Sequence, residues 1–337
     1  MAVIMLEGVM ILALVLSGFR KAVMDAIPLD LRQAIGIGIG LFITFIGLKG
    51  AGLIVADDST FISLGTLTSP SAVVAIVALI TAILLTILKV PGALLISIVV
   101  AVIIGLPLGV TPIPTTWSFG LDFSAFAAPF QPVDGVLAIV QVIMQPALWL
   151  FVFSLLMSDF FDTLGIVVAV GKEAGFVDQN GDVEDIQPIL TVDSSAAILG
   201  GFLGASSITC YIESTSGAAE GARTGLSNLV VGGMFLICAF LAPIFSMVSG
   251  AATCGALVVV GFLIMSDVGS IDWGKAELAF PAFLIIVGIP FTYSITNGIG
   301  LGFIAYVLLM VARGKVREVK PLMWVAALAF MAMFIFV

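Results

Sequence analysis

Histidine is absent from this chain of 337 residues, and only three cysteines occur. Without histidine, the chain lacks the commonest metal ligand and the usual proton shuttle near neutral pH, so any proton chemistry falls to carboxylates. The cysteines have no paired spacing, which argues against a disulfide framework and favours small apolar packing residues. No metal-ligand cluster and no activated serine or cysteine arrangement is visible, which makes an enzyme the weakest functional alternative.

Charge is also scarce, since charged residues make up 10% of the chain, hydrophobic residues 61%, and the mean hydropathy is +1.29. Several runs approach the roughly 20 apolar residues that span a bilayer. The composition therefore predicts an all-α, multi-pass integral membrane protein surrounded by lipid, with the plasma (inner) membrane as its expected location. The net charge of −9 lies mainly in loops, and no basic stripe suggests nucleic acid as a partner.

Hydropathy predicts spans near residues 1–19, 33–55, 71–88, 92–110, 143–170, 192–204, 226–248, 250–267, 279–295 and 298–313. Residues 29–33 are expected to form a short link before the second span. A last apolar run, 321–337, either spans the membrane or lies against the bundle. The positive-inside rule then makes one set of loops cytoplasmic. Its basic members are Arg20, Lys21, Arg32, Lys89, Lys172, Arg223, Lys275 and the cluster 313–320.

Two carboxylates interrupt the span 143–170. Asp159 and Asp162 are three residues apart and so lie on neighbouring positions of one helical face. An aspartate at the centre of a membrane helix costs about 2.5–3.5 kcal/mol, so such residues generally face a cavity or a partner. We expect Asp162 to bind a substrate, whereas a structural or cavity-rim role is equally plausible for Asp159. Phe161 could stack on a planar ligand, although membrane phenylalanines usually serve packing alone.

A polar segment at 205–217 interrupts the apolar sequence with hydroxyls and one carboxylate, Glu213. Strand formers precede Glu213 and small residues follow it, which predicts a short strand around 207–212 and then a short helix. Irregular backbone at membrane depth must line protein or a cavity, which is where a transporter binds its substrate. We expect Glu213 to bind ligand; the alternative is an acid buried against Arg223 or nearby hydroxyls. Thr209 and Ser214 supply hydroxyls for ligand or for the broken backbone.

Three further polar residues favour structural roles. Glu220 and Arg223 are three residues apart near the cytoplasmic end, which is typical of a local ion pair or cap. Asp193 precedes two serines at the predicted start of a short span, which fits a helix cap. The acidic stretch 178–185 does not follow the spacing of a calcium loop. No metal site is expected, and no cofactor beyond a coupling ion, H⁺.

The motifs Phe161-Asp162-Thr163-Leu164-Gly165, Gly204 to Ser214 and Arg223-Thr224-Gly225-Leu226, in this order, resemble the nucleobase–cation symporter family of xanthine, uracil and ascorbate permeases. The likeness is strongest to its adenine/guanine/hypoxanthine permease branch and covers essentially the whole chain. It implies fourteen spans in two inverted seven-span repeats, divided into core and gate domains. Strands in the third and tenth spans would pair at the substrate site. The matching acids, Asp162 and Glu213, are implied to hold the base and to couple its transport to protons.

By this mapping, residues 1–110 are the last four spans of the first repeat, and 111–142 are an extracellular linker and the approach to the next span. The second repeat is 143–313, with core spans at about 143–248 and gate spans at about 250–313, followed by a basic loop and apolar helix at 314–337. The first three spans would be missing, so the chain is expected to be N-terminally truncated. Because an intramembrane strand needs an antiparallel partner, we expect little or no transport by the chain alone.

The sequence therefore predicts a purine nucleobase permease that works by proton symport and alternating access. Alternatives are a different cargo, such as uracil, xanthine or an oxyanion, and an inactive fragment or non-transporting membrane scaffold. Competition by unlabelled compounds separates the cargoes, and a stable partner complex without a base-dependent thermal shift would favour the scaffold. The sequence leaves open which purine is preferred, whether H⁺ or Na⁺ is coupled, and the oligomeric state, a homodimer included.

Overall fold

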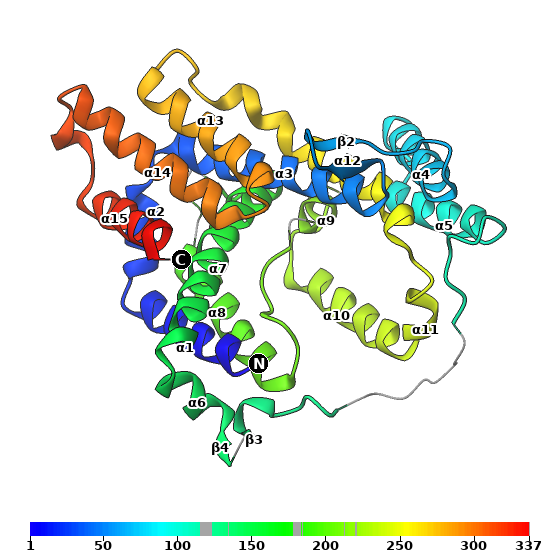
Figure 1. Cartoon of the computed structure of the whole chain (residues 1–337), viewed down its shortest axis with the longest axis horizontal. Coiled ribbons are helices and arrows are strands. Elements are labelled where there is room, and N and C mark those ends of the chain that lie inside the picture. The colour runs from blue at the N-terminus through cyan, green and yellow to red at the C-terminus, as the bar shows by residue number, and fades with distance from the viewer. Residues whose placement is uncertain are drawn as a thin grey trace. The chain divides into compact units, whose positions relative to one another are not determined.

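The computed structural model describes residues 1–114, 123–133, 135–177, 183, 185–211, 213–219 and 221–336. This part of the chain is mostly helical (Figure 1). Its α-helices are α1 (Ala2–Leu16), α2 (Phe19–Ala26), α3 (Leu29–Gly50), α4 (Pro70–Ile87), α5 (Ala93–Gly105), α6 (Ala138–Met144), α7 (Pro146–Ala174), α8 (Ile186–Leu203), α9 (Ser214–Ala219), α10 (Gly225–Phe240), α11 (Ala242–Phe245), α12 (Gly250–Met265), α13 (Ala276–Phe291), α14 (Ile295–Ala312) and α15 (Pro321–Phe336).

Short elements complete the described chain. Its 3-10 helices are η1 (Ala128–Phe130), η2 (Ser266–Ser270) and η3 (Val316–Glu318). Strands β1 (Ile54–Asp57) and β2 (Phe61–Leu64) form one antiparallel hairpin, and β3 (Pro132–Val133) and β4 (Val136–Leu137) form another. Both hairpins lie in segments that the sequence assigns to loops between spans.

Five helical segments of the described chain are long and apolar enough to cross a bilayer, namely α3, α4, α8, α12 extended through η2, and α14. The bent pair α6 and α7 adds a sixth if it is one span. The helices α1, α5, α10, α13 and α15 are also apolar but shorter. Apolar helices are the only open-chain elements that satisfy their own backbone groups in lipid, so the helical, multi-pass membrane class predicted from composition is confirmed.

The predicted single span 143–170 is wrong in its first turn. Helix α6 ends at Met144, α7 begins at Pro146, and the two axes differ in direction by 93°. Gln145 between them is extended, with φ −99° and ψ 106°. Proline excludes helical backbone from the residue before it and fits the first position of a new helix. The proline therefore sets the bend.

Two predicted starts of helices also need correction. Helix α8 begins at Ile186, six residues before the predicted start at 192, because Pro188 lies in its first turn, where the missing N–H has no intrahelical partner anyway. Helix α3 begins at Leu29, so the predicted link at 29–33 is already helical. Pro28 accepts hydrogen bonds from Leu31 and Arg32 through its carbonyl oxygen, which starts this helix directly after the proline.

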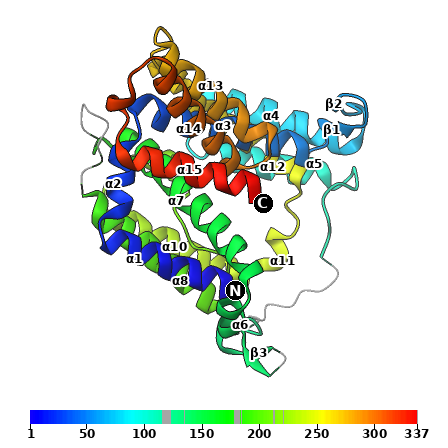
Figure 2. The ribbon, with the colours of Figure 1, turned by 60° about the vertical axis from the view of Figure 1, so that its left-hand side comes forward.

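The chain divides into two compact units, and the first comprises Met1–Gly38, Asp122–Arg223 and Asp267–Val337. In this unit α1 and α8 lie side by side (Figures 1 and 2). They approach closely at small residues: a Cβ atom at Gly8 would lie 2.8 Å from the Ile198 nitrogen, and one at Gly201 would lie 2.7 Å from the Met5 nitrogen. The pairing of Met5 with Gly201 and of Gly8 with Ile198 makes the two helices antiparallel.

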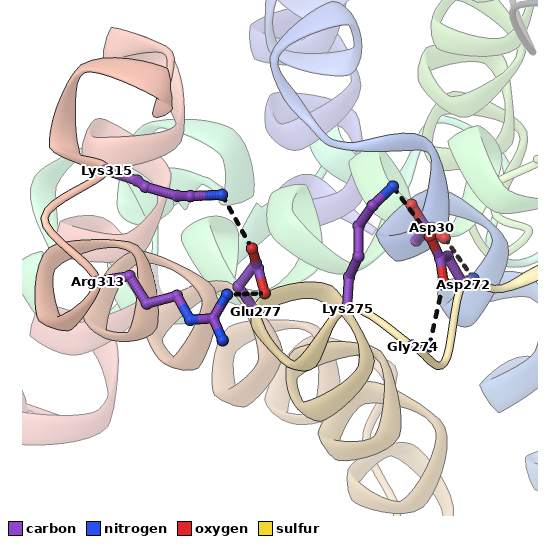
Figure 3. Close-up of polar contacts among 7 residues, drawn as sticks. All are labelled: Asp30, Asp272, Gly274, Lys275, Glu277, Arg313 and Lys315. Carbon is purple, nitrogen blue, oxygen red and sulfur yellow. Dashed lines mark hydrogen bonds and ion pairs between the residues drawn. The ribbon is translucent and has the colours of Figure 1, made fainter.

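Helices α13 and α14 form a second tight pair in the same unit, as small residues allow in membrane proteins. A cluster of charges joins their ends (Figure 3). Glu277 at the start of α13 pairs with Arg313 at 2.9 Å and with Lys315 at 3.1 Å. These residues follow or precede the membrane spans on the side that the positive-inside rule makes cytoplasmic.

The loop before α13 is fixed to the start of α3 beside this cluster (Figure 3). The Asp272 amide donates to the Asp30 carboxylate at 2.8 Å. Hydrogen bonds from the Lys275 ammonium and then the Gly274 amide hold the pKa of Asp272 below its usual range. Lys320 in turn donates to the Asp25 carbonyl oxygen. The loops near residues 25–30, 272–277 and 313–320 thus lie at one end of the unit, which confirms the predicted common side for these three.

The second unit comprises Ile39–Leu121 and Thr224–Ser266. Its buried core lies where α4, α5 and α12 pack together, and alanines dominate it. Side chains of this size let helix backbones approach closely where lipid offers no hydrophobic driving force between helices. In the β1–β2 hairpin of this unit, Asp57 accepts hydrogen bonds from the amides of Ser59 and Thr60, each at 2.9 Å. The hairpin turn is thus closed by a side chain.

Candidate functional site

The first wall of the candidate site is the middle of α7. Thr163 is fully buried there, and Asp159 and Asp162 are partly exposed beside it. Asp162 lies within electrostatic range of Asp159, Asp193 and Glu213. The structure therefore gathers into one place the two acids expected to bind substrate and two acids to which the sequence gave structural roles.

The second wall forms where the chain reverses after α8. Gly204 ends the helix in the left-handed conformation with φ +82°, which glycine adopts without strain, and the Ala205 amide donates to the Gly200 carbonyl oxygen at 2.9 Å. The following residues then run back across α8, because a Cβ atom at Gly200 would lie 2.3 Å from the Ser206 carbonyl oxygen. This reversal brings residues 205–211 back to the level of Asp193.

Asp193 joins both walls through one buried carboxylate, of which 5% is exposed. Its Oδ2 accepts a hydrogen bond from the Thr163 hydroxyl at 2.9 Å. Its Oδ1 accepts from the Thr209 hydroxyl at 3.2 Å and from the Cys210 amide at 3.3 Å. Buried carboxylates are tolerated when such donors satisfy them. Asp193 thus holds the irregular segment against α7 and α8.

The two threonine hydroxyls limit how this network is wired. Their oxygens are 3.1 Å apart, and each hydroxyl carries a single proton. When the Thr163 hydroxyl donates its hydrogen bond to Asp193, the Thr209 hydroxyl divides its single hydrogen bond between Asp193 and the Thr163 oxygen. A change in the charge of Asp193 therefore reaches both segments through these protons.

The predicted strand around 207–212 is not found in the described residues 207–211. A strand requires a hydrogen-bonded neighbour, and no described segment pairs with these residues as a ladder. The Cys210 amide instead donates to a side chain, Asp193. Ile212 lies outside the described residues. The segment is thus irregular, as predicted for a broken span, but without the strand.

The short helix expected after Glu213 is confirmed as α9, which begins at Ser214 and packs against α7. Glu213 and Ser214 are exposed, so Glu213 is not the buried acid of the alternative interpretation. Arg223 donates to the carbonyl oxygens of Ala218 and Ala222 and so caps the last turn of α9. Glu220 lies outside the described residues, as does the side chain of Phe161, whose backbone belongs to α7.

The predicted helix cap at Asp193 is wrong, since Asp193 lies eight positions into α8. Ser194 and Ser195 do not act as caps either, because their hydroxyls donate to the carbonyl oxygens one turn earlier, at 2.8 and 2.7 Å. The cap followed from the late predicted start of the helix. With Pro188 placed in the first turn, the rule that singled out Asp162, a carboxylate within an apolar span, would also have singled out Asp193.

Chemically, the site offers several carboxylate acceptors next to backbone that belongs to neither a helix nor a strand. Carboxylates accept hydrogen bonds from N–H donors, and the irregular backbone of residues 206–211 offers both donors and acceptors. Such a surface suits a small, planar, neutral ligand that carries N–H groups and ring acceptors. Among the described residues, no group of three or more cysteine, aspartate or glutamate side chains is arranged to hold a metal ion.

Comparison with known proteins gives consistent matches along the chain. Residues 1–301 match the model of the Permease family, the xanthine/uracil permease family. The chain is 38% identical to the guanine/hypoxanthine permease PbuG of Bacillus subtilis (strain 168) over 335 residues, which is 99% of this chain and 74% of that protein. It is 37% identical to the adenine permease AdeP of Escherichia coli (strain K12) over 314 residues, 92% of this chain and 68% of that protein.

Proposed function

The chain belongs to the xanthine/uracil permease family and is a membrane transporter, and we propose that its cargo is a purine nucleobase. The names of its relatives support this, since they describe permeases for guanine, hypoxanthine and adenine. The observation that carries the proposal is the gathering of Asp162, Asp193 and Glu213 beside the irregular backbone of residues 206–211. This is the arrangement of acceptors that a base rich in N–H donors requires.

In this proposal Asp162 and Glu213 contact the base directly. Their carboxylates accept hydrogen bonds from ring N–H and exocyclic amino groups, and charge-assisted bonds of this kind are roughly twice as strong as neutral ones. Ser214, and Phe161 through stacking, add contacts. Thr209 faces Asp193 and positions the segment, with its hydroxyl within reach of a bound base.

Transport in this proposal follows alternating access coupled to a proton. Asp162 or Glu213 takes up one proton and loses its charge, which changes the affinity for the base and the balance between outward-facing and inward-facing states. The movement occurs between core spans, about 143–248, and gate spans, about 250–313, within an inverted-repeat architecture. The plasma membrane is the proposed location.

Variants of the two binding acids test this assignment. We expect Asp162→Asn and Glu213→Gln to lower the uptake of labelled hypoxanthine by about tenfold or more, since each loses a charge-assisted hydrogen bond. Asp58→Asn and Glu318→Gln are matched controls at exposed positions. Uptake by both site variants at the level of these controls, with equal amounts of protein in the membrane, would remove Asp162 and Glu213 from the binding site.

The name of the matching family keeps uracil and xanthine as the second candidate cargo. A carboxylate that accepts from ring N–H groups does not by itself distinguish purines from pyrimidines. Competition against labelled hypoxanthine separates these cargoes. We expect unlabelled guanine and adenine to compete more strongly than uracil or xanthine. Stronger competition by uracil would reassign the substrate to a pyrimidine, and stronger competition by xanthine would reassign it to another purine.

A further inference from the structure

The proposed site does not use the buried carboxylate of Glu7. It lies in the middle of the apolar helix α1, with 1% of its surface exposed. Ionisable side chains at membrane depth are costly and mark proton or substrate pathways. The cost of burying Glu7 indicates that this residue has a role, and its position in the first unit suggests which one.

Glu7 points into the interior of the unit. At 3.6 residues per turn, Leu16 projects from the side of α1 opposite to Glu7, and Ile11 from nearly the same side. Leu16 is 68% exposed and Val9, also on that far side, is 44% exposed, whereas Ile11 is fully buried. The Glu7 side chain thus lies on the face that packs against the rest of the unit.

The helix contacts fix the level of Glu7 relative to the site. The antiparallel register of Met5 with Gly201 and Gly8 with Ile198 places Glu7 between one and two turns, about 9 Å along the axis, from Asp193. Ala2 shares a packed cluster with Val152 of α7.

Helix α7 runs parallel to α1, because Val152 near its start packs with Ala2, whereas Thr163 further along it bonds Asp193, whose level lies beyond Glu7 along α1. Counting from Val152 along α7 then puts Glu7 within about a turn of the level of Asp159. Asp162 follows one turn further along α7. Along the direction of the α1 axis, Glu7 and Asp159 lie at nearly the same level. Asp162 lies further along, and Asp193 lies furthest from Glu7.

We propose that Glu7 is a proton-coupling residue that passes the transported proton between the outer side and the substrate site. The inference rests on the proposed proton symport. The Glu7 carboxylate accepts one proton from water on the outer side, becomes a neutral carboxylic acid, and gives the proton to Asp162, which regenerates the Glu7 carboxylate. Among the elements packed against α1, α7 carries Asp159 and Asp162 and, near its end, Lys172 and Glu173; α8 carries Asp193; α2 carries Arg20, Lys21 and Asp25; α6 and η1 carry no titratable group.

Proteoliposomes that contain the purified full-length protein separate proton coupling from the movement of substrate across the membrane. An inward proton gradient drives net accumulation, which requires coupled proton movement, whereas exchange of internal for external hypoxanthine does not. We expect Glu7→Gln to accumulate hypoxanthine about tenfold less than wild type while its exchange rate stays within about twofold. Glu7→Asp, which retains a carboxyl group, should restore accumulation with a displaced pH optimum. Glu318→Gln, on an exposed segment, should behave as wild type in both assays.

The possible results distinguish failure of the Glu7 inference from failure of the proposed function. Accumulation by Glu7→Gln with the pH profile of wild type would place coupling in Asp162 or Glu213 alone and overturn the inference. Loss of both exchange and accumulation, in a variant that reaches the membrane in normal amount, would also overturn the inference. Glu7 would then be needed for substrate movement or for folding rather than for proton coupling. Absence of any purine transport by wild type would instead reject the proposed function.

An infrared titration tests Glu7 without transport. Across a pH titration, we expect wild type to gain and lose a carboxylic-acid carbonyl band that is missing in Glu7→Gln and shifted in Glu7→Asp. If Glu7→Gln does not fold, the comparison of Glu7→Asp with wild type remains. Identical titrating bands in wild type and the folded variant would show that Glu7 keeps one protonation state, which would overturn the inference.

Discussion

Asp193 shows how one side chain can determine the shape of a membrane site. Both of its oxygens accept hydrogen bonds, from Thr163 on one side and from Thr209 and the Cys210 amide on the other. An amide in its place keeps one acceptor oxygen and turns the other into an NH₂ donor. Facing the Cys210 amide, that donor would meet another donor; facing Thr163, it would require the hydroxyl to accept instead of donating to residue 193, in a buried place where mismatched groups are costly.

Asp193→Asn is therefore expected to loosen residues 205–211 from α7. The loss should amount to about 1–3 kcal/mol of unfolding free energy, and uptake should fall because the site loses its wall. Thermal unfolding of the detergent-solubilised chain measures the first effect, and uptake of labelled hypoxanthine measures the second.

Ser194→Ala is the matched control for this variant. Ser194 is equally buried and adjacent, but its hydroxyl donates only within α8, to the Leu190 carbonyl oxygen. Its loss should leave both measurements close to wild type. Equal behaviour of the two variants would show that Asp193 does not organise the site.

At the scale of elements, the reversal after α8 depends on the space at Gly200. Alanine is the better helix former by about 0.5–1 kcal/mol, but its Cβ atom would lie 2.3 Å from the Ser206 carbonyl oxygen, a backbone atom that cannot rotate away. The overlap outweighs the gain in helix propensity. The irregular segment must then move away from α8.

Gly200→Ala is accordingly expected to lower both uptake and the unfolding temperature, and to speed proteolysis within residues 205–211. Gly36→Ala in α3 offers the same chemical change in a helix with no atom within 4 Å of the added Cβ. We expect it to be neutral or slightly stabilising. If Gly200→Ala were as stable and active as Gly36→Ala, the close approach of the segment to α8 would be refuted.

The ends of α13 and α14 are joined by Glu277, whose side chain is 9% exposed and contacts both Arg313 and Lys315 (Figure 3). Removing one partner of a shielded ion pair leaves the remaining charges without compensation. Glu277→Gln should therefore lower the temperature at which the solubilised chain unfolds. Glu318→Gln removes only a 3.9 Å contact from a carboxylate that is 62% exposed, and should not change it. An equal, unchanged unfolding temperature in both variants would contradict a role for Glu277 in holding the helix pair.

At the scale of the whole molecule, composition predicts the membrane class because lipid restricts the chain to helices that bury their own hydrogen bonds. The acids Asp162 and Glu213 could be predicted for the same reason, since a carboxylate in an apolar run stands out. Features that depend on residues distant in the sequence could not be predicted. A strand at 207–211 requires a neighbour that local sequence does not specify, and the 93° bend at Gln145 requires Pro146 to start a helix rather than interrupt one.

Sequence reasoning missed the roles of Asp193 and Glu7 for different reasons. Asp193 was placed at a helix end because Pro188 and the polar residues before it resemble a loop, and only the folded chain shows that the helix already contains them. Glu7 has the same signal as Asp162, a carboxylate surrounded by apolar residues. Its cost at membrane depth can be read from the sequence, whereas its burial is seen only in the folded chain.

Uptake of labelled adenine, guanine and hypoxanthine by cells that lack purine transport tests the central claim most directly. With the full-length protein in the membrane, we predict saturable uptake above the vector control that rises when the outside is acidified and falls when a protonophore removes the gradient. Asp162→Asn, present in equal amount, should reduce that uptake toward the control. Uptake of all three bases equal to the vector control, from a chain shown to reach the membrane folded, would contradict the account.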